Sequence, residues 1–545
     1  MKSKRILVIQ LERLGDLVQT TPLLQDLLKA DPECLIDLLV LEGNQIVVRD
    51  LPGVDPVRAI PEHEVAALSL EVEACFRKRE LPTTAAKTLK ALDLPSYDRV
   101  INVTHNAFGC WIAPRISAHE CEGGYINDQG EWLVKGPWHI YLVALIDFRE
   151  ENLFNLVDLY RGSAVTDSIP ARDRKPYCFQ VSDPGVALPQ GEIVALNPGA
   201  HRARRRWPAA FFAKLARMLA GHGLNPVLVG APADREVCSE VIRQCGTDLP
   251  DYSGKTTLPQ MARLLADSEL LVSNDTGAVH LAAAAGTPVV GLFGVTAFFR
   301  ETSPWGEGHL ILQTPLNQES ASMEKLAPEV VCAAVLDRLG RISGDELSRT
   351  LEQHNIPAWE TYFLPQGADP LGGLAYRPLH AHPPAMDALL LSLLRHGLAA
   401  GLSTNPRLPD SSILSRLYAD EIMESRTRSR EWEKGVALIE TRFVDPLRKL
   451  ANKAGPMQAA AHAKNTSALE AISTAAGELK SGLDELKAAA VEHRWAGLVI
   501  AYLDWKLRLL PPLDPIPLFK EYEKAYLHAA SLFDHLRDSL RRMDG

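Results

Sequence analysis

The sequence predicts two consecutive α/β units, each with a mostly parallel sheet covered by helices, followed by a mostly α-helical C-terminal extension. Short and nearly continuous apolar runs, at 5–10 and 35–41, are followed by stretches with a helical pattern. Such runs are typical of strands buried on both faces of a parallel sheet. A second alternation of the same kind begins near residue 192. From 412 to 508 Ala, Leu, Glu, Lys and Arg dominate, which indicates long helices.

The first unit is expected to span residues 1–165. Its predicted strands cover 5–10, 35–41, 57–60 and 99–103, and a helix follows Gly15. The N-terminal apolar run is interrupted at Glu12 and Arg13, so it is shorter than the ~7–15 residues of a signal-peptide core. We therefore interpret this run as the first buried strand.

The second unit is expected at 192–325, after a linker at 166–191 that is rich in Pro, Asp and Ser. Its predicted strands are 193–196, 226–229, 270–273 and 289–293, and its predicted helices are 208–220, 234–245, 259–266 and 276–285. The extension, 326–545, begins with a helical stretch at 327–354. Because 356–385 is dense in Pro and Gly, we expect irregular chain there.

Composition excludes several classes of protein. The chain has 545 residues, 46% hydrophobic and 23% charged, which is ordinary for a folded protein and rules out a disordered or fibrous one. A net charge of −10 argues against a nucleic-acid binder. None of the eight Cys is spaced as in C-x-x-C, so we expect reduced thiols and no metal site. No run approaches ~18 uninterrupted apolar residues, so we expect no membrane span and a cytoplasmic protein.

The first candidate site is Arg13, Gly15 and Asp16, just past the first predicted strand. In open α/β sheets ligands bind at the carboxyl ends of the strands. Asp16 has two interpretations. It either caps the following helix or acts as a carboxylate general base that faces a cleft between the units.

The second candidate site is N-P-G-A-H-R-A-R-R-R-W-P, residues 197–208, between a predicted strand and a helix. Backbone amides around Gly199 can face an anion, and four arginines lie within five residues, among them Arg205 and Arg206. Guanidinium groups match phosphate oxygens well. The alternative is a basic loop that is simply solvated.

The third candidate site is S-N-D-T-G-A-V-H-L-A-A-A-A-G-T-P, residues 273–288. The amides of Thr276, Gly277 and Ala278 would lie at a helix N-terminus, which attracts anions. His280 is one turn further along and could face the same cleft. The alternative is that Asp275 caps this helix and His280 is a packed core residue.

Several common motifs are absent from the sequence. It contains no G-x-x-x-x-G-K-[ST] phosphate loop, no G-x-S-x-G elbow and no D-x-D pair. A Walker-type ATPase and a metal-bridged diphosphate of the D-x-D kind are therefore unsupported.

Taken together, the three stretches resemble glycosyltransferase family 9, the ADP-heptose:lipopolysaccharide heptosyltransferases. The matching residues are 6–24, N-P-G-A…R-R-W-P and S-N-D-T-G-A-V-H-L-A-A-A-A-G-T-P, in the family's order, over about 1–315. The resemblance implies a GT-B fold, in which two doubly wound Rossmann-like domains face a cleft. It also implies inverting, metal-independent transfer from a nucleotide-diphosphate sugar.

The resemblance also implies roles for individual residues. Asp16 matches the catalytic base, with Arg13 and Gly15 on the acceptor side. The donor diphosphate would be bound by Gly199, Arg205, Arg206, Thr276, Gly277 and Ala278. The donor sugar or ribose would lie near Glu236, Asp275 and His280. Arg205 stands where the family usually has Lys, so either Arg205 or Arg206 takes that role.

The implied ligands are a nucleotide-sugar donor, ADP-heptose at the family level, and a glycan or lipid-linked acceptor. No separate cofactor and no nucleic acid are expected, and peripheral contact with the inner membrane fits such an acceptor. Side chains that either line an acceptor groove or pack in the core are His105, Asn106, Trp111, Trp132, Trp138 and His139. Two alternatives are a GT-B-type sugar-nucleotide epimerase and a non-catalytic interaction protein that works through its helical tail.

Overall fold

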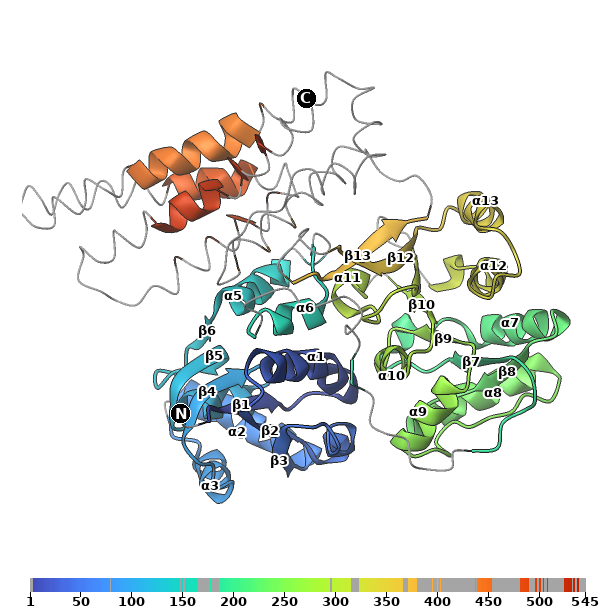
Figure 1. Ribbon diagram of the computed structural model, residues 1–545, viewed down its shortest axis with the longest axis horizontal. Coiled ribbons are helices and arrows are strands. Elements are labelled where there is room, and N and C mark those ends of the chain that lie inside the picture. The colour runs from blue at the N-terminus through green and yellow to red at the C-terminus, as the bar shows by residue number, and fades with distance from the viewer. Residues whose placement is uncertain are drawn as a thin grey trace, which may run out of the picture.

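A computed structural model of the chain describes most of its first 379 residues and scattered parts of the rest. The described ranges are 3–164, 176–177, 186–314, 323–365 and 371–379, without residues 79, 148, 150, 151, 295 and 296. Beyond them it describes 439–452, 481–489 and 524–531, together with 395, 399, 402, 437, 496, 499, 500, 503, 507, 533, 534, 537 and 538. Figure 1 shows two α/β units side by side, with the described C-terminal helices beyond α5 and α6.

The first unit is built on a six-stranded sheet with the strand order β3-β2-β1-β4-β5-β6. Its strands are β1 (Arg5–Gln10), β2 (Leu35–Leu41), β3 (Val54–Ile60), β4 (Tyr97–Asn102), β5 (Ala118–Ile126) and β6 (Trp132–Lys135). All neighbours are parallel except β5 and β6. The four predicted strands are confirmed, whereas β5 and β6 were not predicted.

Helices cover both faces of this sheet. They are α1 (Leu14–Ala30), α2 (Glu62–Lys78), α3 (Thr83–Ala91), α4 (Ala107–Ile112), α5 (Pro137–Ala144) and α6 (Leu156–Arg161). Side chains of a strand alternate between faces. In β1, Ile6 and Val8 accordingly enter the core beneath α1, while Leu7 and Ile9 enter the core on the opposite face. The strand is therefore buried on both sides and holds the loop that follows it in place.

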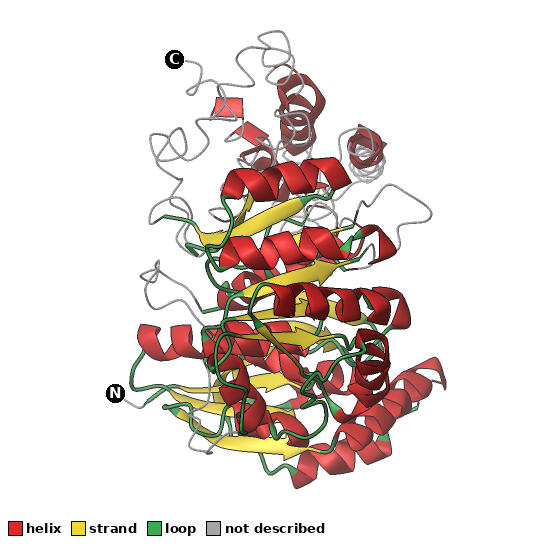
Figure 2. Cartoon of the chain, turned by 90° about the vertical axis from the view of Figure 1, so that its right-hand side faces the viewer, coloured by secondary structure: helices red, strands yellow, loops and turns green. Residues whose placement is uncertain are grey.

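The second unit has a seven-stranded sheet with the strand order β13-β12-β11-β10-β9-β7-β8. Its strands are β7 (Ile193–Asn197), β8 (Asn225–Leu228), β9 (Leu270–Asn274), β10 (Val289–Phe293), β11 (Leu310–Gln313), β12 (Ala358–Phe363) and β13 (Leu374–Pro378). Its helices are α7 (Ala209–Gly221), α8 (Arg235–Cys245), α9 (Leu258–Ala266), α10 (Gly277–Ala285), α11 (Phe299–Thr302), α12 (Pro328–Arg338) and α13 (Gly344–His354). Figure 2 shows the strands stacked between layers of helices.

The prediction of irregular chain over 356–385 is wrong for β12 and β13. These strands add an antiparallel edge to the sheet, and Trp359 of β12 stacks on Phe299 at 4.2 Å between ring centroids. Of the Pro and Gly residues that suggested loops, Pro357, Pro365, Gly372 and Gly373 flank the strands and Pro378 is the last residue of β13. The rest of 356–385, at 366–370 and 380–385, lies outside the described residues. The second sheet therefore runs past the boundary expected at residue 325.

The parts of the C-terminal region that are described are helical, at 445–452, 481–489 and 524–531. Phe443 and Phe533 stack there at 4.8 Å between ring centroids. The remaining residues of the predicted helices, and most of the expected linker, lie outside the described residues. Among the described helices, none is both long and apolar enough to cross a bilayer.

A buried ionic cluster joins the two units. Arg161 of α6 donates to Asp26 of α1 at 2.8 Å and to the Leu371 carbonyl at 3.1 Å. Asp158, also on α6, accepts from the Trp305 indole at 3.1 Å and from the Leu374 amide at 2.8 Å. Because these partners belong to both units, α6 holds them together.

Candidate functional site

A cavity of about 520 Å³ lies between the two units and takes its lining from both. The lining residues are Arg13, Leu14, Gly15, Asp16 and Gln19 from the first unit, and Asn197, Arg205, Gly230, Ala231, Pro232, Asp234, Thr256, Thr257, Leu258, Met261, Asp275, Thr276, Gly277, Ala278, His280, Leu281 and Thr302 from the second. It lies at the carboxyl ends of β1, β7 and β9, where open α/β sheets bind ligands. Its volume is within the ~300–1,000 Å³ of small-molecule sites.

Asp16 takes part in the N-terminal cap of α1 and also lines the cavity. It lies in the first turn of α1, and its Oδ2 accepts a hydrogen bond from the Arg13 amide at 3.2 Å. Its carboxyl also lines the cavity. Burial, reinforced by the negative charge of Glu12, raises the pKa of Asp16 to about 6. A carboxylate with that pKa is a competent proton acceptor near neutral pH.

The backbone at Asp16 is held by two neighbouring polar side chains. Gln10, at the end of β1, donates from Nε2 to the Asp16 carbonyl at 3.3 Å and to Thr20 Oγ1 at 2.8 Å. Thr20 in turn donates to the same carbonyl at 2.7 Å. The position of the carboxyl in the cavity is therefore supported by buried contacts of β1 and α1.

Arg205 brings the positive charge of the 197–208 loop into the cavity. Its Nη1 donates to Asp275 Oδ2 at 2.8 Å, and burial lowers the pKa of Arg205 while raising that of Asp275. Arg206 instead donates from Nε to the Ala200 carbonyl at 3.0 Å and does not line the cavity. Of the two arginines that sequence left as alternatives, Arg205 is the one placed to meet a ligand.

Gly199 supports the loop without lining the cavity. The carboxyl of Asp234 packs against it, and a Cβ at this position would lie 2.2 Å from Asp234 Oδ1. Asp234 itself lines the cavity, and its Oδ2 accepts from the Ala231 amide at 2.9 Å. A glycine is therefore needed at 199 for the loops after β7 and β8 to meet.

The N-terminus of α10 lines the cavity and lies against the loop after β1. Thr276 is its N-cap, since its Oγ1 accepts from the Ala278 amide at 3.3 Å and from Asn197 Nδ2 at 3.0 Å. The alternative in which Asp275 caps this helix is therefore wrong. With Gly277 also in the lining, the positive end of the helix dipole makes this wall attractive to an anion.

His280 lies where the two units touch. It is buried, and burial lowers its pKa to about 4, so the ring is neutral near pH 7. Its Nδ1 has no hydrogen-bond partner among the described residues. A Cβ on Gly15 would come within 2.9 Å of His280 Cδ2, so the loop after β1 fits closely against α10.

Comparisons with known proteins agree with this geometry. Residues 169–330 match glycosyltransferase family 9 (heptosyltransferase). Lipopolysaccharide heptosyltransferase 3 of Escherichia coli is 25% identical over 300 residues, which is 53% of this chain and 83% of the relative. Lipooligosaccharide heptosyltransferase 2 of Haemophilus influenzae is 34% identical over 115 residues, which is 20% of this chain and 33% of the relative.

These matches identify a heptosyltransferase-like domain of glycosyltransferase family 9 within residues 169–330. Among solved structures, the glycosyl transferase family 9 protein of Veillonella parvula DSM 2008 covers 62% of this chain and 98% of its own, with 21% identity and a TM-score of 0.48.

Besides Gly199 and Arg206, a third donor-side residue predicted from the sequence is not brought to the cavity. Glu236 is exposed on the first turn of α8 and is not part of the lining. Asp234, two residues earlier, lines the cavity instead. Sequence reasoning also missed Thr256, Thr257, Leu258 and Met261, although T-x-x-Q at 257–260 is a capping box that could have marked the start of α9.

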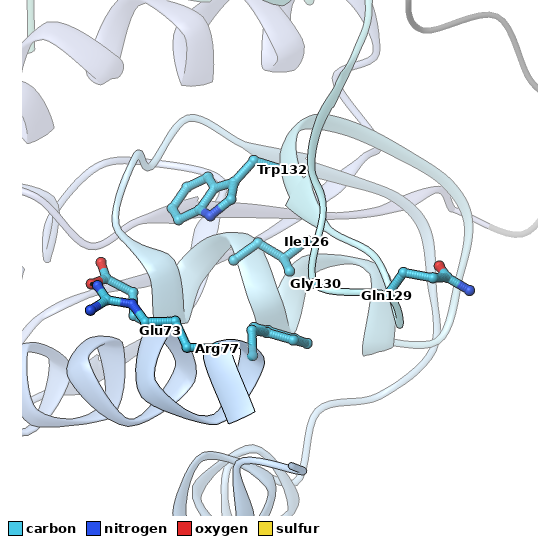
Figure 3. A pocket seen from close by; sticks show the side chains of 7 residues that line it. Glu73, Arg77, Ile126, Gln129, Gly130 and Trp132 are labelled. Atoms are coloured by element: carbon cyan, nitrogen blue, oxygen red, sulfur yellow. The ribbon is translucent and has the colours of Figure 1, made fainter. Parts of the chain in front are cut away.

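The candidate acceptor residues of the transferase separate into three groups. Trp111, Trp138 and His139 are buried, so core packing explains them. Trp132 is half-exposed and lines a second cavity, of about 360 Å³, with Phe76 and Arg77 (Figure 3). His105 and Asn106 lie on the loop after β4, where their amides contact Glu12. Within the described residues no group of three His, Cys, Asp or Glu could hold a metal ion.

Substitution of Gly15 by Ala tests the fit between the units of this transferase. The added Cβ would clash with His280, so we expect a loss of stability of about 1–3 kcal/mol, seen as a lower Tm, together with slower transfer. Gly43→Ala is a matched control because nothing lies within 4 Å of its Cβ position. Equal melting temperatures for the two variants would show that the contact is not tight.

Proposed function

We propose that this protein catalyses inverting, metal-independent transfer of a heptose from a nucleotide-diphosphate donor to a glycan acceptor of the lipopolysaccharide type. One observation carries the proposal. Asp16 from the first unit and Arg205 with the α10 N-terminus from the second line the same cavity. A proton acceptor and an anion site therefore line one space, whose volume suits a small-molecule ligand. The names of the curated relatives support heptose as the sugar.

In the proposed reaction the donor diphosphate lies against Arg205 and the amides of Thr276 to Ala278. An acceptor hydroxyl attacks the anomeric carbon from the face opposite the diphosphate, and Asp16 takes its proton. The new C–O bond forms as the bond to the diphosphate breaks, so the configuration inverts and a nucleoside diphosphate leaves. Positive groups already in place stabilise the charge that grows on the leaving group.

The leaving diphosphate needs no bound metal in this proposal, because Arg205 and the helix N-terminus supply positive charge. The donor, ADP-heptose by family resemblance, is a substrate, and no separate cofactor is proposed. A lipid-linked acceptor would bring the protein to the cytoplasmic face of the inner membrane.

Incubation of the protein with ADP-heptose and a heptose-deficient lipopolysaccharide tests the overall reaction. We expect release of ADP that needs the acceptor and continues in excess EDTA. Loss of turnover with EDTA would overturn metal independence. Conversion of the donor without any acceptor would instead identify an epimerase.

Substitution of Arg205 by Ala tests the diphosphate site. We expect the affinity for ADP, measured by calorimetry, to fall about 10–100-fold, because charge-assisted hydrogen bonds contribute about 1.5–3 kcal/mol. Arg204→Ala is a matched control because it removes the same charge from an exposed residue that does not line the cavity. Equal affinities of the two variants would count against the site.

A further inference from the structure

Glu12 connects two loops at the edge of the cavity. It lies on the loop after β1, and its Oε1 accepts hydrogen bonds from the amides of His105 and Asn106, both at 3.0 Å. The same oxygen accepts from Asn106 Nδ2 at 3.2 Å. One carboxylate oxygen therefore binds three N–H groups of the loop that follows β4.

Neighbouring contacts make this junction rigid. Asn106 also donates to the Leu11 carbonyl at 2.9 Å and caps α4 through the Gly109 amide at 2.8 Å. The Leu11 amide donates to Thr104 Oγ1. Asn44 donates from Nδ2 to the Glu12 carbonyl at 3.1 Å. Loops from three crossovers of the first sheet therefore meet around Glu12, at the base of the segment that carries Asp16.

We propose that Glu12 is a positioning residue for the transfer reaction, which holds the loops after β1 and β4 together and keeps a negative charge beside Asp16. This proposal rests on the proposed function, in which Asp16 is the base. A like charge nearby favours the protonated form of a carboxyl, so it makes the ionised form a stronger base. Glu12 acts through Asp16 and need not touch either substrate.

None of the other charged or titratable groups considered around Asp16 supplies the negative charge that we assign to Glu12. On the same segment Arg13 opposes it, because its positive charge lowers the pKa of Asp16. From α6 the phenol of Tyr160 is held neutral, since burial raises its pKa well above the usual value. From α10 His280 is neutral above about pH 4. Across the cavity Arg205 and Asp275 pair with one another.

The test compares Glu12→Gln with Glu12→Asp, and measures kcat/KM for transfer between pH 4.5 and 8. Glu12→Gln keeps an oxygen acceptor but removes the charge. We expect it to move the midpoint of the acid limb down by about 0.5–1 pH unit and to lower the plateau several-fold. Glu12→Asp retains the charge, so its midpoint should stay close to that of the unmodified protein. Glu33→Gln, at an exposed position before β2, is the charge-matched control.

Thermal unfolding and ADP affinity show whether each variant is folded. An acid limb that stays in place in a folded Glu12→Gln variant would overturn the role of Glu12, whatever its rate. The same profile is then recorded for Asp16→Asn. If Asp16→Asn retains the acid limb, the limb belongs to another group, and the role of Asp16 as the base in the proposed function is refuted. If Asp16→Asn loses the acid limb but Glu12→Gln leaves its midpoint unchanged, only the inference about Glu12 is refuted.

Discussion

Asp16→Asn is expected to slow transfer by about 10²–10⁴-fold while ADP binds nearly as well as before. Asn keeps the shape of the side chain and can still accept the hydrogen bond from the Arg13 amide, but it cannot take a proton. The anion-binding groups, Arg205 and the α10 N-terminus, belong to the other unit and are unchanged. Transfer rates and ADP calorimetry on the same preparation separate the two effects.

The same substitution should stabilise the protein at neutral pH. The pKa of Asp16 rises from 3.8 to about 6 on folding, so between these values the folded state binds more protons than the unfolded state. Stability therefore falls as the pH rises through this window and stays lower above it. Asn has no charge to bury, so we expect the free energy of unfolding of Asp16→Asn to exceed that of the unmodified protein by on the order of 1–3 kcal/mol at pH 7.5. This difference should vanish near pH 4.

A gain in Tm with a loss of turnover would identify Asp16 as a functional residue held at the expense of stability. Asp248→Asn serves as the control, because Asp248 is exposed and lies outside the cavity lining. Near-normal transfer by Asp16→Asn would reject the base. An unchanged Tm at pH 7.5 would show that the carboxyl is better solvated than its burial indicates.

Much of the site could be predicted because its chemistry is local in the sequence. Asp16, Arg205 and Thr276 each follow a buried apolar strand within a few residues, and parallel strands bring their carboxyl ends to one edge. The apolar runs identify the strands, and the polar residues that follow therefore have to meet at that edge. Gly15, in the loop after β1, packs against His280 of α10, so residues that follow strands of the two different sheets also meet.

The remaining lining depends on contacts that no local pattern encodes. Asp234 reaches the cavity because the loop after β8 folds against Gly199, whereas Glu236, which the family resemblance suggested, is exposed on α8. Thr257 and Met261 arrive with α9, whose placement depends on the whole sheet. Likewise, β12 and β13 were not predicted, because both strands are short and the Pro and Gly residues near them dominate the composition of 356–385. Arg205 and Arg206 are equivalent in sequence and differ only in the direction of their side chains.

The cluster on α6 shows the same limit most strongly. Nothing around Asp158 in the sequence distinguishes it from a surface helix carboxylate, yet it is fully buried. It accepts from Trp305, Leu374 and Arg161, and Arg395 of the C-terminal region lies 3.8 Å away. A carboxylate without solvent needs this set of donors, so both units and part of the C-terminal region depend on one side chain.

Asp158→Ala is therefore expected to destabilise the protein by about 3–5 kcal/mol, the usual cost of removing one partner from a buried ion pair. The Trp305 indole and the Leu374 amide would lose their acceptor, and among the described residues Arg161 would keep Asp26 as its one carboxylate partner. Because the cluster joins the units, thermal unfolding should shift to lower temperature and separate into two transitions.

Asp128→Ala is the matched control for that experiment. Asp128 also pairs with an arginine, Arg115, but its side chain is 89% exposed, so its loss should change stability by less than about 1 kcal/mol. Asp158→Asn, which keeps the volume and one acceptor oxygen, should fall between the two. Equal shifts for Asp158→Ala and Asp128→Ala would mean that the buried cluster does not hold the units together, and the joint would then have to lie in the apolar packing of α1 against α10.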